Sequence, residues 1–377
     1  MSVPPIPGVS PSPPRLHGMD RLRQFWQRVS EGRQIDDLWT QFVADARSSY
    51  GFYDRDVDWE EIHKLPRWRR PLHVARQFFW ALLLKMSPAR RVLLLVAFVM
   101  LGLSVINSET RFEVVAVMLF VLLLSLELAD KVTMKRDLEI AREIQTWLVP
   151  SQPPEVAGAN IAFATRPQNS VAGDYYDAFY PNPEDRERLM IVIADVAGKS
   201  VPAALLMATL QASLRTIAGE NAALADLVAR LNRYACAHSL NGLRFTTAVL
   251  SEYNPASRRL TYVNAGHNAP ILRRANGTLE TLEVGGLPLG IRSDVGYETA
   301  SLELRPGDAL IFFTDGVVEA FNEAGEEFGN ERWLSAIRNL PDWDAQQSLQ
   351  FLMKRVDEFA GATRQSDDIT CLVFRSR

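Results

Sequence analysis

The sequence contains little cysteine. Of its 377 residues, two are cysteines, Cys236 and Cys371, and they lie far apart. Neither belongs to a CxxC pair or has a histidine nearby at the spacing of metal ligands. A disulfide framework and a thiolate metal site are therefore not indicated, which fits a protein of a reducing compartment.

The chain also lacks several signals that would place it in a common class. It has no internal repeat and no GxxxxGK phosphate loop, so a P-loop nucleotide site is not expected. Residues 1–15 are proline-rich without an apolar core, so we expect no secretory signal and a disordered segment over residues 1–18.

The chain carries little excess charge of either sign, with a formal net charge of -4. Its basic residues are nevertheless concentrated just before the most apolar part of the sequence, at Lys64, Arg67, Arg69, Arg70, Arg76, Lys85, Arg90 and Arg91. This pattern indicates a membrane-facing basic patch rather than a nucleic-acid site. We predict a helical cytoplasmic N-terminal region over residues 19–88.

Two apolar runs follow, over residues 92–106 and 114–126, with a polar loop at residues 107–111 between them. Each run is near or below the roughly 17–25 residues of a spanning helix, although flanking residues can extend it. Basic residues precede the first run and follow the second, which indicates cytoplasmic flanks. We predict a transmembrane helical hairpin over residues 89–129 in the inner (cytoplasmic) membrane; a buried or interfacial hairpin is the alternative.

A linker helix is predicted over residues 130–150, ended by Pro150, Pro153 and Pro154. Its apolar face covers about half of the circumference, more than a two-stranded coiled coil uses. We therefore expect this helix to contact both a partner helix, in a homodimer, and its own downstream domain.

Short strands and paired helices alternate after this point. Strands are predicted at residues 161–165, 190–194, 246–253, 260–264, 269–273, 301–304, 309–313 and 369–374. Hairpin signals stand at Asn254-Pro255, Asn276-Gly277 and Arg305 to Asp308. Helices are expected near residues 202–218, 223–238 and 331–359, the last with a break near Pro341. The pattern predicts an α+β layered sandwich over residues 151–377.

Carboxylates stand where these strands end. An apolar run ends on Asp195, and Asp174, Asp315 and the pair Asp367-Asp368 occupy similar positions. Each aspartate alone is an ordinary turn residue. Together they could converge on hard divalent cations such as Mg²⁺ or Mn²⁺, which prefer oxygen ligands, and a two-metal cluster would activate water and polarise a phosphoryl group.

Five motifs in this order resemble the PPM-type metal-dependent serine/threonine phosphatases, and in particular their bacterial SpoIIE-like branch. They are Gly173-Asp-Tyr-Tyr-Asp177, Asp195-Val-Ala-Gly-Lys-Ser-Val-Pro-Ala-Ala-Leu205, Asn264-Ala-Gly-His-Asn268, Phe313-Thr-Asp-Gly-Val-Val-Glu319 and Asp367-Asp-Ile-Thr370. The resemblance extends from about Leu138 to the C-terminus, and includes the branch's regulatory linker helix.

The resemblance implies two antiparallel β-sheets in a sandwich flanked by helices, with a dinuclear Mn²⁺ or Mg²⁺ site at one edge. It implies that Asp174 and Asp195 are catalytic and hold the metal pair, with Asp195 bridging and the carbonyl of Val196 as a further ligand. Asp315 and Asp367 would complete the first metal. Asp368 is expected to support the ligands, and Asp177 and His267 to be structural.

The implied reaction is direct attack of a metal-activated water on phosphoserine or phosphothreonine, without a phosphoenzyme. The sequence departs from the family at Ser200, where glycine is usual, and Lys199 is expected to be solvated. The implied substrate is a cytoplasmic phosphoprotein of a partner-switching pathway, such as an anti-sigma antagonist with a STAS domain. A catalytically inactive signalling scaffold and a nucleotide or lipid phosphoesterase are the alternatives.

Overall fold

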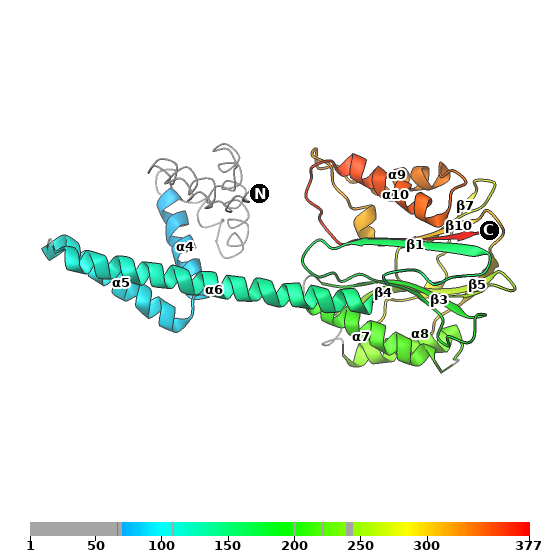
Figure 1. The fold of residues 1–377 in the computed structure, drawn as a ribbon, viewed down its shortest axis with the longest axis horizontal. Helices are drawn as coiled ribbons and strands as arrows, with labels where there is room; N and C mark the ends of the chain where they lie inside the picture. The colour runs from blue at the N-terminus through cyan, green and yellow to red at the C-terminus, as the bar shows by residue number, and fades with distance from the viewer. Residues whose placement is uncertain (1–65, 67–69, 108, 199–200, 221, 239–243) are drawn as a thin grey trace, which may run out of the picture. The chain divides into compact units, whose positions relative to one another are not determined.

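The computed structural model describes residues 66, 70–107, 109–198, 201–220, 222–238 and 244–377. The predicted disordered segment over residues 1–18, most of the predicted region over residues 19–88, and Lys199 and Ser200 lie outside the described residues. The chain divides into two compact units, Met1–Ala129 and Asp130–Arg377, which are described separately (Figure 1).

The first unit contains helix α4 (Arg70–Lys85), helix α5 (Pro88–Asn107) and the start of helix α6 (Thr110–Leu148). Helices α5 and α6 are long and apolar enough to cross a membrane, with mean hydropathies of 2.1 and 2.4 over their most apolar stretches. Arg91 donates hydrogen bonds to the carbonyls of Leu84 and Met86, so its charge meets the C-terminal end of α4. Helix α6 continues unbroken into the second unit, so the second predicted span and the linker form one helix.

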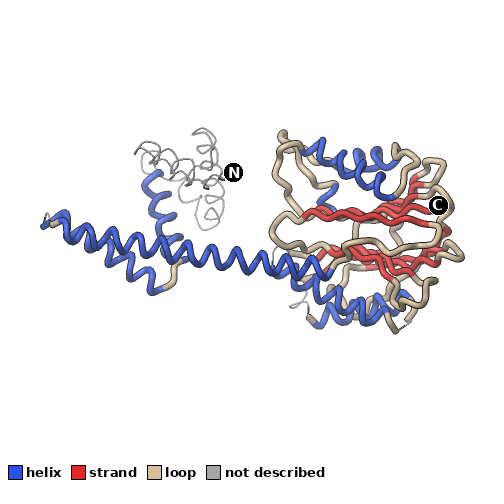
Figure 2. Tube along the Cα trace, in the orientation of Figure 1, coloured by secondary structure: helices blue, strands red, loops and turns tan. Residues whose placement is uncertain are grey.

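Two β-sheets form the centre of the second unit (Figure 2). The first has the strand order β1 (Ala159–Arg166), β11 (Ile369–Ser376), β10 (Ala309–Phe313), β6 (Ile271–Arg273) and β7 (Leu279–Thr281). The second has the order β2 (Tyr175–Phe179), β3 (Leu189–Val196), β4 (Thr246–Asn254), β5 (Arg259–Ala265) and β8 (Gly285–Gly286), and β9 (Ala300–Glu303) also pairs with β5. These strands pair antiparallel except for the short parallel pair of β5 and β8.

A helical layer covers the outer face of each sheet (Figure 2). Helices α7 (Val201–Ala218) and α8 (Leu224–Ala237) pack on the second sheet, and α9 (Gly329–Arg338) and α10 (Ala345–Ala360) pack on the first. Side chains such as Ile191, Phe312 and Phe374 fill the space between the sheets. Helix α7 is also long and apolar enough to span a membrane, but its Met207 and Leu214 are buried against the second sheet.

The predicted α+β sandwich of antiparallel sheets is confirmed. The hairpin predicted at Arg305 to Asp308 is wrong, because this turn joins β9 and β10, which belong to different sheets. The signals at Asn254-Pro255 and Asn276-Gly277 do connect paired strands, β4 with β5 and β6 with β7.

Candidate active site

Asp174 lies directly before β2 and is 4% exposed. Its Oδ2 accepts hydrogen bonds from the Oγ1 atoms of Thr314 at 3.0 Å and Thr370 at 2.6 Å. Burial, and then the negative charge of Asp195, raise the pKa of Asp174 well above its usual range, while the two hydroxyls act in the opposite direction. Thr370 lies in β11 and Thr314 directly follows β10, both of the first sheet, whereas Asp174 precedes β2 of the second sheet. The two hydrogen bonds of Asp174 therefore connect the edges of both sheets.

Asp195 is the penultimate residue of β3, and Val196 ends that strand. Both lie beside Gly173: a Cβ atom added there would stand 3.2 Å from the carbonyl oxygen of Val196 and 3.7 Å from Oδ1 of Asp195. Glycine therefore lets the segment that carries Asp174 approach the end of β3 closely. The structure brings together three of the predicted ligands, Asp174, Asp195 and Val196.

Asp315 and Asp367 lie on two neighbouring segments of the first sheet. Asp315 opens the short 3₁₀ helix η2 (Asp315–Val317) after β10, and Asp367 lies two residues before β11. A Cβ at Gly316 would stand 2.0 Å from the carbonyl oxygen of Asp368, so the two segments are in direct contact. This close approach requires glycine at position 316.

Asp368 fixes the segment that leads to Asp174. Its two carboxylate oxygens accept hydrogen bonds from the backbone N–H groups of Gln168 and Gly173, each at 2.7 Å. Burial raises the pKa of Asp368, and these N–H groups oppose the shift. Its contacts are those of the supporting role expected from the sequence.

The oxygen ligands at this edge of the two sheets suit a hard divalent cation. Asp174 and Asp195 repel each other, and no basic side chain among the described residues is hydrogen-bonded to Asp174. A bound cation would offset this repulsion, and carboxylates and a backbone carbonyl are ligands that Mg²⁺ and Mn²⁺ accept. In the described part of the chain, however, no three His, Cys, Asp or Glu side chains form a group that could hold a metal, so the four-aspartate ligand set stays a prediction.

Asp177 has the structural role expected of it. Its carboxylate is fully buried, accepts a hydrogen bond from the Tyr175 hydroxyl at 2.6 Å, and binds Arg215 of α7 through two hydrogen bonds of 2.9 Å. The guanidinium of Arg215 also lies 4.0 Å from the centre of the Phe179 ring. This ion pair ties α7 to β2, three residues from Asp174.

His267 is also part of the scaffold. It is 8% exposed, its Nδ1 lies 2.8 Å from the Thr247 hydroxyl, and its backbone N–H donates to the side chain of Asn264. Burial lowers the pKa of His267 to about 4, while the backbone of Phe313 acts in the opposite direction. The imidazole is therefore neutral at neutral pH.

The linker helix reaches the site through Gln145. Its side-chain amide donates to the carbonyl of Ala172 at 2.7 Å and accepts from the Ala172 N–H at 2.9 Å. Ala172 directly precedes Gly173 and Asp174, so one side chain of α6 holds the backbone beside a predicted metal ligand. Val149, just after α6, packs against the core beneath the second sheet.

Sequence reasoning missed the hydroxyls of Thr314 and Thr370. A signal was present, because each threonine belongs to a motif that contains a predicted metal ligand, Asp315 or Asp367.

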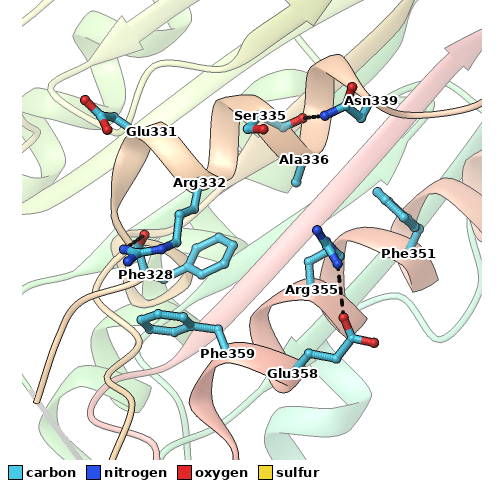
Figure 3. A pocket seen from close by; sticks show the side chains of 10 residues that line it. All are labelled: Phe328, Glu331, Arg332, Ser335, Ala336, Asn339, Phe351, Arg355, Glu358 and Phe359. Carbon is cyan, nitrogen blue, oxygen red and sulfur yellow. Dashed lines mark hydrogen bonds and ion pairs between the residues drawn. The ribbon is translucent and has the colours of Figure 1, made fainter. Parts of the chain in front are cut away.

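A groove of about 450 Å³ lies elsewhere, between α9 and α10 (Figure 3). Arg332 stacks on Phe359 at one end of it, and Arg355 pairs with Glu358 along its wall. None of the predicted metal ligands lines this groove, so its size does not make it the active site.

Comparisons with known proteins identify the family of this domain. The model of the family described as stage II sporulation protein E (SpoIIE) matches residues 185–377, just over half of the chain. The chain is 31% identical over 192 residues to the phosphoserine phosphatase RsbU of Bacillus subtilis (strain 168), covering 51% of this chain and 56% of that protein. It spans about half the length of the curated relatives it matches.

Solved structures show the same fold. The SiaA-PP2C domain of Pseudomonas aeruginosa superposes with a TM-score of 0.56 at 22% identity, over 66% of this chain and 99% of that domain. The RsbU and RsbW domains of Rv1364c from Mycobacterium tuberculosis give a TM-score of 0.50 at 25% identity, over 61% of this chain and 63% of that one. From its family match, its fold and the carboxylates at its sheet edge, the chain belongs to the SpoIIE family.

Proposed function

We propose that the chain is a metal-dependent protein phosphatase that hydrolyses phosphoserine or phosphothreonine on a cytoplasmic regulatory phosphoprotein. The observation that carries the proposal is the approach of Asp174 to Asp195 and Val196 at one sheet edge of a SpoIIE-family domain. The similarity to the phosphoserine phosphatase RsbU supports the same reaction class.

Asp174, Asp195, the carbonyl of Val196, Asp315 and Asp367 are the proposed ligands of two Mn²⁺ or Mg²⁺ ions. When bound, the ions would activate water and withdraw charge from the phosphoryl oxygens. The chain itself positions the ligands. Thr314 and Thr370 orient the carboxylate of Asp174. Asp368 holds the backbone N–H groups of Gln168 and Gly173, at the two ends of the segment that leads to Asp174. Asp174 and Asp195 are the carboxylates nearest the reacting groups in this proposal.

The neighbouring helices support a regulated, membrane-tethered enzyme. Helices α5 and α6 could cross a membrane by length and composition, and we place the phosphatase domain on its cytoplasmic side. The apolar side chains Ile140, Ile144 and Trp147 of α6 are exposed, Trp147 by 74%, and they offer a surface for the same helix of a second copy. The proposed partner is an anti-sigma antagonist with a STAS domain.

The test is phosphate release by the full-length protein from a phosphoserine peptide and from a phosphorylated STAS protein, with Mn²⁺, with Mg²⁺ and with EDTA. We expect turnover that needs a divalent cation and is faster on the STAS protein. Cation-independent turnover would contradict the metal mechanism. A folded protein that binds the cation but releases no phosphate from either substrate would instead favour the inactive scaffold.

A further inference from the structure

Arg244 is a partly buried cation beside the active-site edge. It lies two residues before β4, and its Nη1 donates a hydrogen bond to the carbonyl of Ala197 at 3.3 Å. Within the described chain, no acidic side chain forms an ion pair with it. A guanidinium has five N–H donors and no acceptor, so Arg244 can donate to an anion supplied from outside.

Gly198 makes room for this guanidinium. A Cβ atom added at Gly198 would stand 2.2 Å from Nη1 and 3.5 Å from Cζ of Arg244. The backbone of Gly198 also has a φ of +123°, which residues with a side chain rarely adopt. The loop after Asp195 is thus shaped so that Arg244 can lie against it.

Strand register places Arg244 at the end of the second sheet where β3 carries Asp195 and Val196, and its side chain lies on the face that α7 and α8 cover. In the pairing of β3 with β4, Asp195 is opposite Thr247 and Val196 is opposite Thr246. The pairing continues one residue further, since Ala197 N–H donates to the carbonyl of Phe245 at 2.9 Å. Arg244 follows directly, so its guanidinium contacts the two residues that come after Asp195 and Val196.

The groups around the stem of Arg244 do not neutralise it. It lines a small hollow with Leu206 of α7, with Tyr234 and His238 of α8, and with Leu289. None of these neighbours carries a negative charge, so the guanidinium keeps N–H groups beyond Nη1 for a ligand.

We infer that Arg244 binds the phosphoryl group of the substrate, and that it binds inorganic phosphate, the product with the same chemistry, in the same way. The inference deepens the proposed function and rests on it. A guanidinium can donate two parallel N–H···O bonds to phosphoryl oxygens, a geometry that an ammonium group cannot reproduce. Arg244 is then a substrate-binding residue contributed by the second sheet, separate from the metal ligands.

The experiment compares the full-length wild type with Arg244→Met, which keeps much of the stem, and with Arg244→Lys, which keeps the charge. Inorganic phosphate binding is measured in the presence of Mg²⁺ by ³¹P NMR titration and as the inhibition constant in phosphopeptide hydrolysis. We expect both constants and the KM to rise about tenfold in Arg244→Met, as for loss of a charged hydrogen bond, and by less in Arg244→Lys. The Mg²⁺ concentration for half-maximal activity should not change.

Arg355→Met is the matched control, because Arg355 lies in the groove between α9 and α10 and should leave all these constants unchanged (Figure 3). If Arg244→Met hydrolyses the phosphopeptide and binds inorganic phosphate as tightly as the wild type, the inference about Arg244 is wrong and the proposed function stands. A loss of phosphate affinity matched by an equal loss of Mg²⁺ affinity would show that Arg244 only supports the loop, and would also overturn it. A wild type that hydrolyses no phosphopeptide would overturn the proposed function, and the inference with it.

Discussion

At the scale of single residues, the candidate site consists of carboxylates that are held by neutral donors. Asp174 accepts from two threonine hydroxyls, and Asp368 accepts from two backbone N–H groups. Such donors orient a carboxylate without cancelling its charge. The aspartates could be predicted because each lies next to the end or the start of a strand. The motifs of Asp315 and Asp367 also contain Thr314 and Thr370, but the hydrogen bonds of these two hydroxyls to Asp174 could not be predicted, since they depend on how two sheets face each other.

The first residue-scale prediction concerns His267. The folded protein keeps its pKa near 4, while the unfolded chain has the ordinary value of 6.5. Between pH 4 and pH 6.5 the unfolded state therefore binds more protons than the folded state, and the free energy of unfolding falls as the pH falls. The stabilisation that the neutral imidazole of His267 provides is complete above pH 6.5 and is lost as the pH falls toward 4. This loss should be about 3 kcal/mol of unfolding free energy.

The measurement for His267 is denaturant unfolding of wild type and His267→Gln between pH 7 and pH 4. The difference between the two proteins should shrink as pH falls, because the variant has no imidazole to protonate. A difference that is independent of pH would contradict the buried neutral imidazole.

The second residue-scale prediction concerns Arg215. Replacing it by Met leaves the fully buried carboxylate of Asp177 with the Tyr175 hydroxyl but without its cation. Burial already raises the pKa of Asp177. We expect a loss of about 2 kcal/mol in unfolding free energy, below the range for fully buried pairs because Arg215 is 41% exposed.

Thermal and urea unfolding of Arg215→Met, Asp177→Asn and the double variant would measure this pair. The double variant should be more stable than the sum of the single losses predicts. Strict additivity would show that the two side chains do not interact.

At the scale of elements, helix α6 is connected to the site through the side chain of Gln145. Gln145→Ala removes both hydrogen bonds to Ala172 and should loosen the segment that carries Asp174. At roughly 1 kcal/mol for a hydrogen bond, we expect the Mn²⁺ concentration for half-maximal activity to rise about fivefold or more. Thr146→Ala is the control, because that hydroxyl bonds only within α6 among the described contacts; equal metal requirements in both variants would contradict the link.

The strands and helices also show which parts of the fold can be predicted from short stretches of sequence. Short apolar runs identified β3, β10 and β11 almost to their ends, and the predicted break near Pro341 separated α9 from α10. Strand β2 was missing from the predicted strands because its residues Tyr175 to Phe179 include an aspartate and lack a β-branched residue. The turn after β9 was misread because the partners of β9 and β10 lie far away in sequence.

At the scale of the whole molecule, the chain combines a SpoIIE-family domain with helices that could span a membrane. Composition and hydropathy predicted the apolar helices, and ordered motifs predicted the family. The domain limits, the homodimer and the metal ligands remain predictions, because they depend on a second chain, a membrane or bound ions rather than on local sequence.

The measurement that tests the central claim most directly is phosphate release from a phosphoserine substrate by the full-length protein with Mn²⁺, comparing wild type, Asp195→Asn and the exposed control Asp294→Asn. Asp195→Asn removes a charge from the proposed metal site, so its rate should fall by about 100-fold or more, while Asp294→Asn keeps the wild-type rate. Equal rates in wild type and Asp195→Asn would contradict a phosphatase site built around Asp195.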